Sequence, residues 1–208
     1  MKYRIAISGS YGGMNLGDEA ILEGILKELR ASMNVDVTVF SRNPKDTEER
    51  HKVRAVPIRE MHKDDVFEEL KRLDLFVLGG GGILYDGAAE GFLRDVNWAK
   101  ELGIPVMVYA ISAGPLDAPA SKQLVAEVMN KVDKITVREA EAKRVLHDLG
   151  VNHDIEVTTD PALLLSPQTF TKEMLKKEGI QSDMPLVGFS VREPGPAAPE
   201  LNIEQYHA

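Results

Sequence analysis

Short apolar runs rich in β-branched residues alternate with segments of helical periodicity along most of the chain. The first run covers residues 3–8, and apolar residues spaced three or four apart follow it between Leu16 and Leu29. Strands and helices in turn are typical of a parallel sheet with helices on both faces. We therefore expect an α/β fold built on a doubly wound, mostly parallel, Rossmann-like sheet.

The same pattern places the individual elements. Strands are expected at residues 3–8, 35–40, 53–58, 74–78, 105–111, 134–137 and 155–158. Helices are expected at 16–29, 64–73, 88–102, 118–130 and 140–149, with a loop and a short helix at 41–52. Gly103 and Gly150 directly follow two of these helices, as glycine commonly does at a helix end. Strand 53–58 is expected at the edge of the sheet, because Pro57 cannot donate to a central ladder.

The character of the sequence changes after residue 165. Residues 166–185 contain prolines and a lysine-rich stretch, and they predict an interdomain connection with one short helix. Residues 186–192 then predict another buried strand, before a proline-rich loop and the first turn of a helix. A strand, a loop and one helical turn cannot bury a core of their own. We expect a Rossmann-like domain at 1–165, a connection at 166–185 and the start of a truncated second domain at 186–208.

A glycine-rich stretch, Gly9–Ala20, separates the first strand from the first helix. Its polar and glycine positions are Gly12, Gly13, Asn15, Gly17, Asp18 and Glu19. Their spacing is not that of a dinucleotide-binding loop, and the second strand ends without an acidic residue for a ribose. Asp18 and Glu19 would also repel a pyrophosphate at the helix N-terminus, so the loop suits hydroxyl groups. Alternatively, Asn15 is only an N-cap and the two acids only face the helix dipole.

Further polar and glycine-rich segments follow the other expected strands. They are the run Gly79, Gly80, Gly81 and Gly82, then Ser112 and Gly114, then Arg138 and Asp160. Ligands of open α/β sheets bind at the carboxyl ends of the strands, where the strand order reverses. With the strand order 3-2-1-4-5, both glycine-rich loops would face one crevice.

Each of these segments has a purely structural alternative. The four glycines can form a tight turn between a strand and a helix. Arg138 can pair with Glu139 or Glu141 on the surface, and Asp160 before Pro161 can initiate a turn. Ser112 lacks the sequence context of a nucleophile.

Composition excludes several classes of protein. The chain has 208 residues, no cysteine and a net charge of −8, and no basic cluster stands out in its sequence, so nucleic acid is not an expected partner. No disulfide or thiolate metal site can form, and the histidines lack the spacing of metal ligands. The longest apolar run, 106–111, is far shorter than the ~20 residues of a membrane span. We expect a soluble, cytoplasmic protein without a transmembrane segment.

Taken together, the motifs resemble those of the polysaccharide pyruvyl transferase family, including the enzymes that pyruvylate secondary cell-wall polysaccharides. The matching segments are residues 12–20, 78–86, 110–115, 136–138 and 159–164, within a resemblance that spans residues 3 to 192. The resemblance implies a GT-B-like fold of two Rossmann-like domains with the active site between them. It also implies transfer of a pyruvyl group from phosphoenolpyruvate to two hydroxyls of a sugar, which gives a pyruvate ketal and phosphate.

The resemblance further implies roles for individual positions. Asp18, Glu19 and Asp160 are candidates for a base or for positioning hydroxyls, and Arg138 and Arg192 match basic positions. The expected substrate-binding positions are Gly12, Gly13, Asn15, Gly17, Gly80, Gly81, Gly82, Ser112, Gly114 and Arg192. Phosphoenolpyruvate would be a co-substrate, with no cofactor and no metal, and most of its site would lie in the second domain. The 208-residue chain alone is therefore expected to be inactive.

Several alternatives stay open at this stage. The acceptor is a free sugar or a lipid-linked glycan, and a lipid-linked acceptor would bring the protein to the inner face of the membrane. Homo-oligomerisation is also open. Two different functions compete with pyruvyl transfer: a GT-B glycosyltransferase with a nucleotide-sugar donor, and a non-catalytic sugar-binding module.

Overall fold

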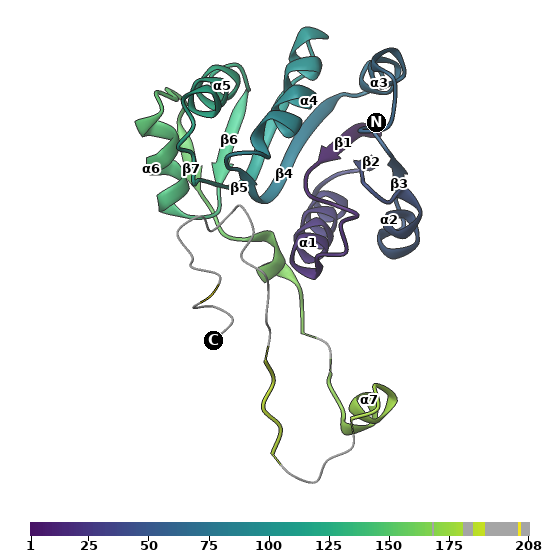
Figure 1. The fold of residues 1–208 in the computed structure, drawn as a ribbon. Coiled ribbons are helices and arrows are strands. Elements are labelled where there is room, and N and C mark those ends of the chain that lie inside the picture. The colour runs from purple at the N-terminus through teal and green to yellow at the C-terminus, as the bar shows by residue number, and fades with distance from the viewer. Residues whose placement is uncertain (168, 181–184, 190–203, 205–208) are drawn as a thin grey trace. The chain divides into compact units, whose positions relative to one another are not determined.

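The structure, a computed structural model, describes residues 1–167, 169–180, 185–189 and 204. A central parallel sheet has the strand order β3-β2-β1-β4-β5-β6-β7 (Figure 1). Its strands are β1 Tyr3–Ser8, β2 Val35–Phe40, β3 Arg54–Val56, β4 Leu75–Leu84, β5 Val106–Ala113, β6 Lys134–Val137 and β7 Ile155–Val157. The doubly wound parallel sheet is confirmed, and β1 and β4 lie side by side where the strand order reverses.

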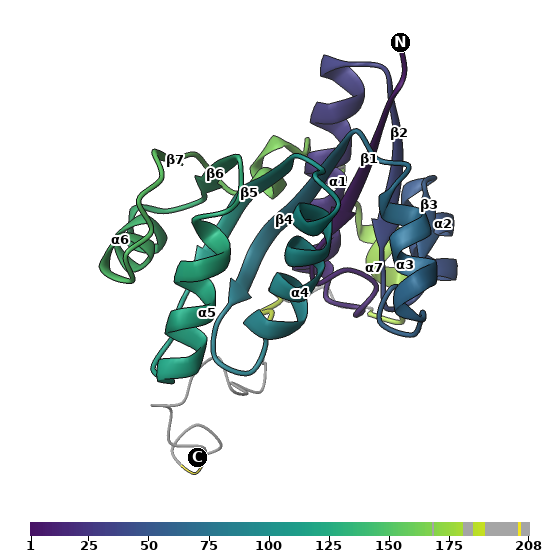
Figure 2. The same ribbon diagram turned by 90° about the horizontal axis from the view of Figure 1, so that it is seen from above.

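Helices cover both faces of this sheet (Figures 1 and 2). They are α1 Leu16–Ser32, α2 Pro44–His51, α3 Lys63–Leu70, α4 Ala89–Glu101, α5 Pro119–Met129 and α6 Ala140–Asp148, followed by the 3₁₀ helix η1 Pro161–Leu164. One core cluster joins α1 to β1, β2 and β4, and the other joins α3, α4, α5 and α6 to the opposite face. Gly103 and Gly150 have φ values of +72° and +88°, as expected for glycines that end helices.

The glycine run forms neither the expected loop nor the alternative tight turn. Residues 79–82 belong to β4, and Gly79, Gly81 and Gly82 pair in register with Tyr109, Ile111 and Ser112 of β5. Ser112 is likewise a strand residue, because β5 continues to Ala113. The prediction that β4 ends at residue 78 is therefore wrong.

The first two glycines of the run have a packing role. A Cβ added at Gly79 would lie 2.5 Å from the hydroxyl oxygen of Tyr11, and one at Gly80 would lie 2.6 Å from Cγ2 of Ile21. Glycine inside a strand often marks such a close approach. Gly80 is thus buried beneath α1, a position that speaks against its expected contact with substrate.

The chain divides into two compact units, Met1–Leu165 and Ser166–Ala208. In the second unit, the expected short helix is present as α7, Lys172–Lys177. Residues 186–189 form no strand, and Leu186, Val187 and Phe189 are exposed. Arg192 and the rest of the expected strand lie outside the described residues. The assignment of residues 166–208 to a connection and a second domain stays a prediction.

Candidate functional site

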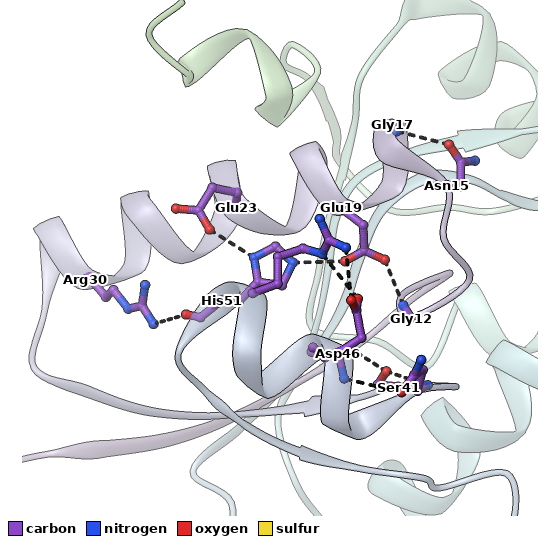
Figure 3. A network of polar contacts seen from close by, with 12 residues as sticks. Gly12, Asn15, Gly17, Glu19, Glu23, Arg30, Ser41, Asp46 and His51 are labelled. Carbon is purple, nitrogen blue, oxygen red and sulfur yellow. Dashed lines mark hydrogen bonds and ion pairs between the residues drawn. The ribbon is translucent and has the colours of Figure 1, made fainter. Parts of the chain in front are cut away.

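The start of α1 is fixed by its own polar residues. Asn15 is the N-cap, and its side chain accepts a hydrogen bond of 3.0 Å from the backbone N–H of Gly17 (Figure 3). This contact confirms the capping alternative for Asn15. Gly17 lies in the exposed first turn of the helix.

Glu19 points away from the strand ends and toward α2. One carboxylate oxygen accepts a 2.9 Å hydrogen bond from the backbone N–H of Gly12, and the other lies 2.9 Å from Nε2 of His51. The second imidazole nitrogen of His51 lies 2.9 Å from a carboxylate oxygen of Glu23 (Figure 3). Both oxygens of the buried Glu19 are thus engaged, which favours a positioning role over the catalytic role suggested by the sequence.

Gly12 and Gly13 pack against the segment after β2. Gly12 is buried with φ +73°, and an added Cβ would lie 2.2 Å from Oγ of Ser41. Gly13 is exposed, and its added Cβ would lie 3.2 Å from a guanidinium nitrogen of Arg42. Close packing therefore accounts for Gly12, while Gly13 lies at the surface.

Asp18 lies toward β4, unlike its neighbour Glu19. A Cβ added at Gly81 would be 3.5 Å from the Oδ1 atom of Asp18. Gly81 has φ +96°, a conformation that side chains rarely adopt. The start of α1 and the glycine run therefore meet at the carboxyl end of β4, as the sequence predicts.

Arg138 and Asp160 form an ion pair at the carboxyl ends of β6 and β7. Nη1 of Arg138 donates to Oδ2 of Asp160 at 2.9 Å, and Nε donates to Glu139 at 3.0 Å. Both the expected surface pair with Glu139 and a contact with a second candidate residue are therefore present. The other Asp160 oxygen accepts from the N–H of Ala162 at 2.9 Å, which confirms its role in the turn.

The outer nitrogen of Arg138 reaches toward the end of β4. Its Nη2 would lie 3.9 Å from a Cβ added at Gly82, which is exposed. Among the described residues, no hydrogen bond from this Nη2 is recorded. Asp18, Gly81, Gly82, Arg138 and Asp160 therefore gather at one part of the sheet edge, and we call them the Arg138 cluster.

The electrostatic environment of this edge is acidic. Tyr11 lies buried beside Gly79, and within the described chain its hydroxyl has no hydrogen-bond partner. Burial raises the pKa of the Tyr11 phenol, and the charges of Asp18, Glu19 and Asp160 raise it further. The charges of three candidate carboxylates thus act on this side chain.

The remaining candidates follow β5 or lie within it. Ser112 is partly buried and is paired with Gly82, which places it next to the cluster. Gly114 has φ +101°, and its N–H donates to the carbonyl oxygen of Leu84 at 2.7 Å. Gly114 thus closes the turn after β5. Residues 1–167, 169–180 and 185–189 contain no group of side chains suited to a metal ion, and none of their helices could cross a membrane.

A second polar feature, a pocket of about 340 Å³ with three arginines, was not expected from the sequence. Arg42 follows β2, Arg59 follows β3 and Arg94 lies in α4. Because these three arginines are far apart in the sequence, they form no basic run. Only the sheet order, which places β2 and β3 near the start of α4, could have suggested their meeting.

The fold and the site define a Rossmann-like α/β protein with its candidate polar groups at the carboxyl edge of a parallel sheet. The chain belongs to the polysaccharide pyruvyl transferase family, whose sequence profile matches residues 15–200. No curated protein matches the chain at a significant level.

Solved structures support the fold. A structure of S. aureus MnaA with UDP matches with a TM-score of 0.54 and 15% sequence identity. The match covers 86% of this chain and 52% of MnaA, so the chain spans about half the length of that protein. At this identity, the likeness concerns the fold alone.

Proposed function

We propose that this protein transfers a pyruvyl group from phosphoenolpyruvate to two hydroxyls of a polysaccharide or lipid-linked sugar. The observation that supports this proposal best is the Arg138–Asp160 ion pair of 2.9 Å, which lies at the same sheet edge as Asp18. These residues lie within the part of the chain that matches the pyruvyl transferase family. A GT-B-like arrangement, with a second domain facing this edge, is part of the proposal.

The charge of the cluster favours binding of the sugar acceptor. Asp18, Glu139 and Asp160 outnumber Arg138, so the edge is net acidic. Carboxylates accept hydrogen bonds from sugar hydroxyls, whereas they repel the carboxylate and phosphate of phosphoenolpyruvate. We therefore assign the acceptor to this edge and most of the phosphoenolpyruvate contacts to residues outside 1–165, among which Arg192 is a candidate.

The reaction needs one base, one acid and one cation. Two hydroxyl oxygens form bonds to C2 of phosphoenolpyruvate, and the bond from C2 to the phosphate oxygen breaks. The two hydroxyl protons are balanced by one proton added to the methylene carbon and one carried by the released phosphate. Asp18 would accept a hydroxyl proton, and Arg138, oriented by Asp160, would pair with the carboxylate or the departing phosphate.

The compartment follows from the donor. Phosphoenolpyruvate is a cytoplasmic metabolite, so we place the reaction in the cytoplasm. A lipid-linked acceptor would bring the protein to the inner face of the membrane.

The test is an assay of the protein with phosphoenolpyruvate and candidate sugar acceptors. Mass spectrometry should detect a ketal on the sugar together with release of phosphate, and Asp18→Asn should abolish both. Asp64→Asn, an exposed acid in the first turn of α3, serves as the matched control and should keep the activity. Transfer from a nucleotide sugar instead would show a glycosyltransferase. Sugar binding without transfer from either donor would show a binding module.

A further inference from the structure

The pocket at the start of α4 has an unusual charge for a protein of net charge −8. Three arginines and two aromatic residues line it together with small residues; the full set is Arg42, Arg59, Tyr85, Gly87, Ala88, Gly91, Phe92 and Arg94. None of these residues is acidic. The pocket therefore concentrates positive charge on an otherwise acidic protein.

Most of that charge is not neutralised within the protein. Arg94 donates to Oδ1 of the buried Asp95 through Nε at 3.2 Å and Nη2 at 3.0 Å. Among the described residues, Arg42 and Arg59 form no ion pair, although Nη2 of Arg42 donates to Oγ of Ser10 at 3.4 Å and the charge of Asp95 acts on Arg59. The pocket thus keeps two unpaired guanidinium groups next to a third that is anchored by a carboxylate.

Aromatic contacts hold two of the guanidinium groups in place. Arg59 lies 5.0 Å from the ring centroid of Phe92, and Arg94 lies 4.6 Å from that of Trp98. Stacking fixes the plane of a guanidinium and leaves its N–H edge available. Gly91 lies on the same wall, and a Cβ added there would be in ordinary contact with Nη2 of Arg59, at 4.0 Å.

The cations also affect one another. Partial burial lowers the pKa of Arg59, and the positive charge of Arg42 lowers it further. An anion between the two arginines would relieve this repulsion. The backbone at the start of α4 adds a partial positive charge on the same wall, although Glu90 in that turn carries a negative charge.

We propose that Arg42, Arg59 and Arg94 form a binding site for a phosphate or diphosphate group, distinct from the Arg138 cluster. Planar guanidinium groups match the several oxygens of a phosphate through paired N–H donors. After pairing of Arg94 with Asp95, the two remaining positive charges match a phosphate dianion. The volume of about 340 Å³ exceeds the size of one phosphate, so it admits a diphosphate and the first atoms of its substituent.

The β1–α1 loop lies between this site and the Arg138 cluster. Gly13 in the loop adjoins Arg42, while Asp18 at the start of α1 adjoins Gly81. A ligand held by its phosphate among the arginines could therefore extend along the same sheet edge. The phosphate site itself does not depend on the proposed reaction, because its binding can be measured without turnover.

Titration calorimetry of the protein with inorganic pyrophosphate tests the site. Arg59→Gln and Arg42→Gln should each weaken binding at least about tenfold, the effect of losing one charge-assisted hydrogen bond. The affinity of Arg59→Lys should lie between those of the parent and Arg59→Gln, because lysine keeps the charge but lacks the paired donors. Arg144→Gln, which removes an exposed arginine of α6, is the matched control and should bind like the parent.

Thermal unfolding of each variant ensures that folded proteins are compared. Absence of pyrophosphate binding by the parent at millimolar concentrations would overturn the proposal. Equal affinities of the parent, Arg42→Gln and Arg59→Gln would overturn it as well.

A competition experiment identifies the source of the phosphate. Bound pyrophosphate is challenged with a soluble sugar diphosphate ester, or with phosphatidylcholine vesicles that carry a lipid with a diphosphate headgroup. Plain phosphatidylcholine vesicles are the control. Displacement by the soluble ester assigns the site to a small molecule, and displacement only by the diphosphate-bearing vesicles assigns it to a lipid headgroup.

Discussion

Glu19 and His51 lie 2.9 Å apart, and their side chains are only 5% and 2% exposed. Glu19 belongs to the first turn of α1, and His51 is the last residue of α2. Since Glu19 also accepts from the N–H of Gly12, it ties the β1–α1 loop and α2 into one unit (Figure 3). The shape of the loop therefore depends on this carboxylate.

The first prediction concerns the stability of this unit. Glu19→Ala should lower the free energy of unfolding by about 2–4 kcal/mol, because it leaves two buried groups without their acceptor. The control is Glu23→Ala on the same helix, which removes the other partner of His51. The Glu23 side chain is 46% exposed, so water can replace it and the loss should stay below about 1 kcal/mol. Equal losses in urea unfolding would contradict the positioning role of Glu19.

The second prediction compares the effects of substituting two glycines of β4, Gly79 and Gly82, on stability. Gly79→Ala should lower the free energy of unfolding by about 1–3 kcal/mol, since the new methyl group would overlap Tyr11. Gly82→Ala should change it by less than about 0.5 kcal/mol, because the nearest atom to an added Cβ is 3.9 Å away. Chemical denaturation of both variants measures the difference. A tolerated Gly79→Ala would show that Tyr11 does not pack tightly on the strand.

The order of elements could be predicted from the sequence because each strand and helix carries its own local pattern. The meeting of Asp18 with the glycine run also followed from topology, since β1 and β4 had to be neighbours at the switch point. Arg138 and Asp160 were found for the same reason: both follow strands at one edge of the sheet.

The contacts of the glycine run could not be predicted in the same way. A missing side chain shows that something approaches the backbone, but it does not distinguish a ligand from a helix. At Gly79 and Gly80 the approaching groups are Tyr11 and Ile21. The contact between Glu19 and His51 could not be predicted either, because it joins residues 32 positions apart through the packing of α1 on α2.

The third prediction concerns pH and Asp95, which lies beneath the arginine pocket. Burial raises the pKa of this carboxyl above its ordinary value, although Arg94, Ser8 and Arg59 act in the opposite direction. The folded state therefore holds this proton at pH values where the unfolded state has already lost it. Stability supplied by the protonated form is present below the ordinary aspartate pKa of about 3.9 and declines as pH rises toward the folded-state pKa.

Asp95→Asn removes this titration while keeping a similar shape. The free energy of unfolding of the parent, relative to the variant, should therefore fall as pH rises from about 4. Urea unfolding of both proteins between pH 4 and pH 7 measures this difference. A difference that grows with pH would show that the contact with Arg94 outweighs the cost of burying the carboxylate.

The last prediction concerns Arg138. It distinguishes a structural role of the ion pair with Asp160 from a catalytic role. Both side chains are nearly 30% exposed, at 28% and 29%, so the pair contributes about 0–1 kcal/mol to stability. Arg138→Lys can keep a contact with Asp160, and Tm should therefore change by a few degrees at most.

Activity should respond far more strongly to the same substitution. Lysine offers a point charge in place of the planar fork whose Nη2 reaches toward Gly82, so it cannot hold Asp160 and an anionic substrate group together. Arg138→Lys should lower kcat/KM for the proposed pyruvyl transfer by on the order of 10²-fold. Arg144→Lys, at an exposed pair with Glu141, should leave it unchanged. If Arg138→Lys also leaves turnover unchanged, Arg138 serves only its ion pairs, and the positive charge for the reaction comes entirely from outside this edge.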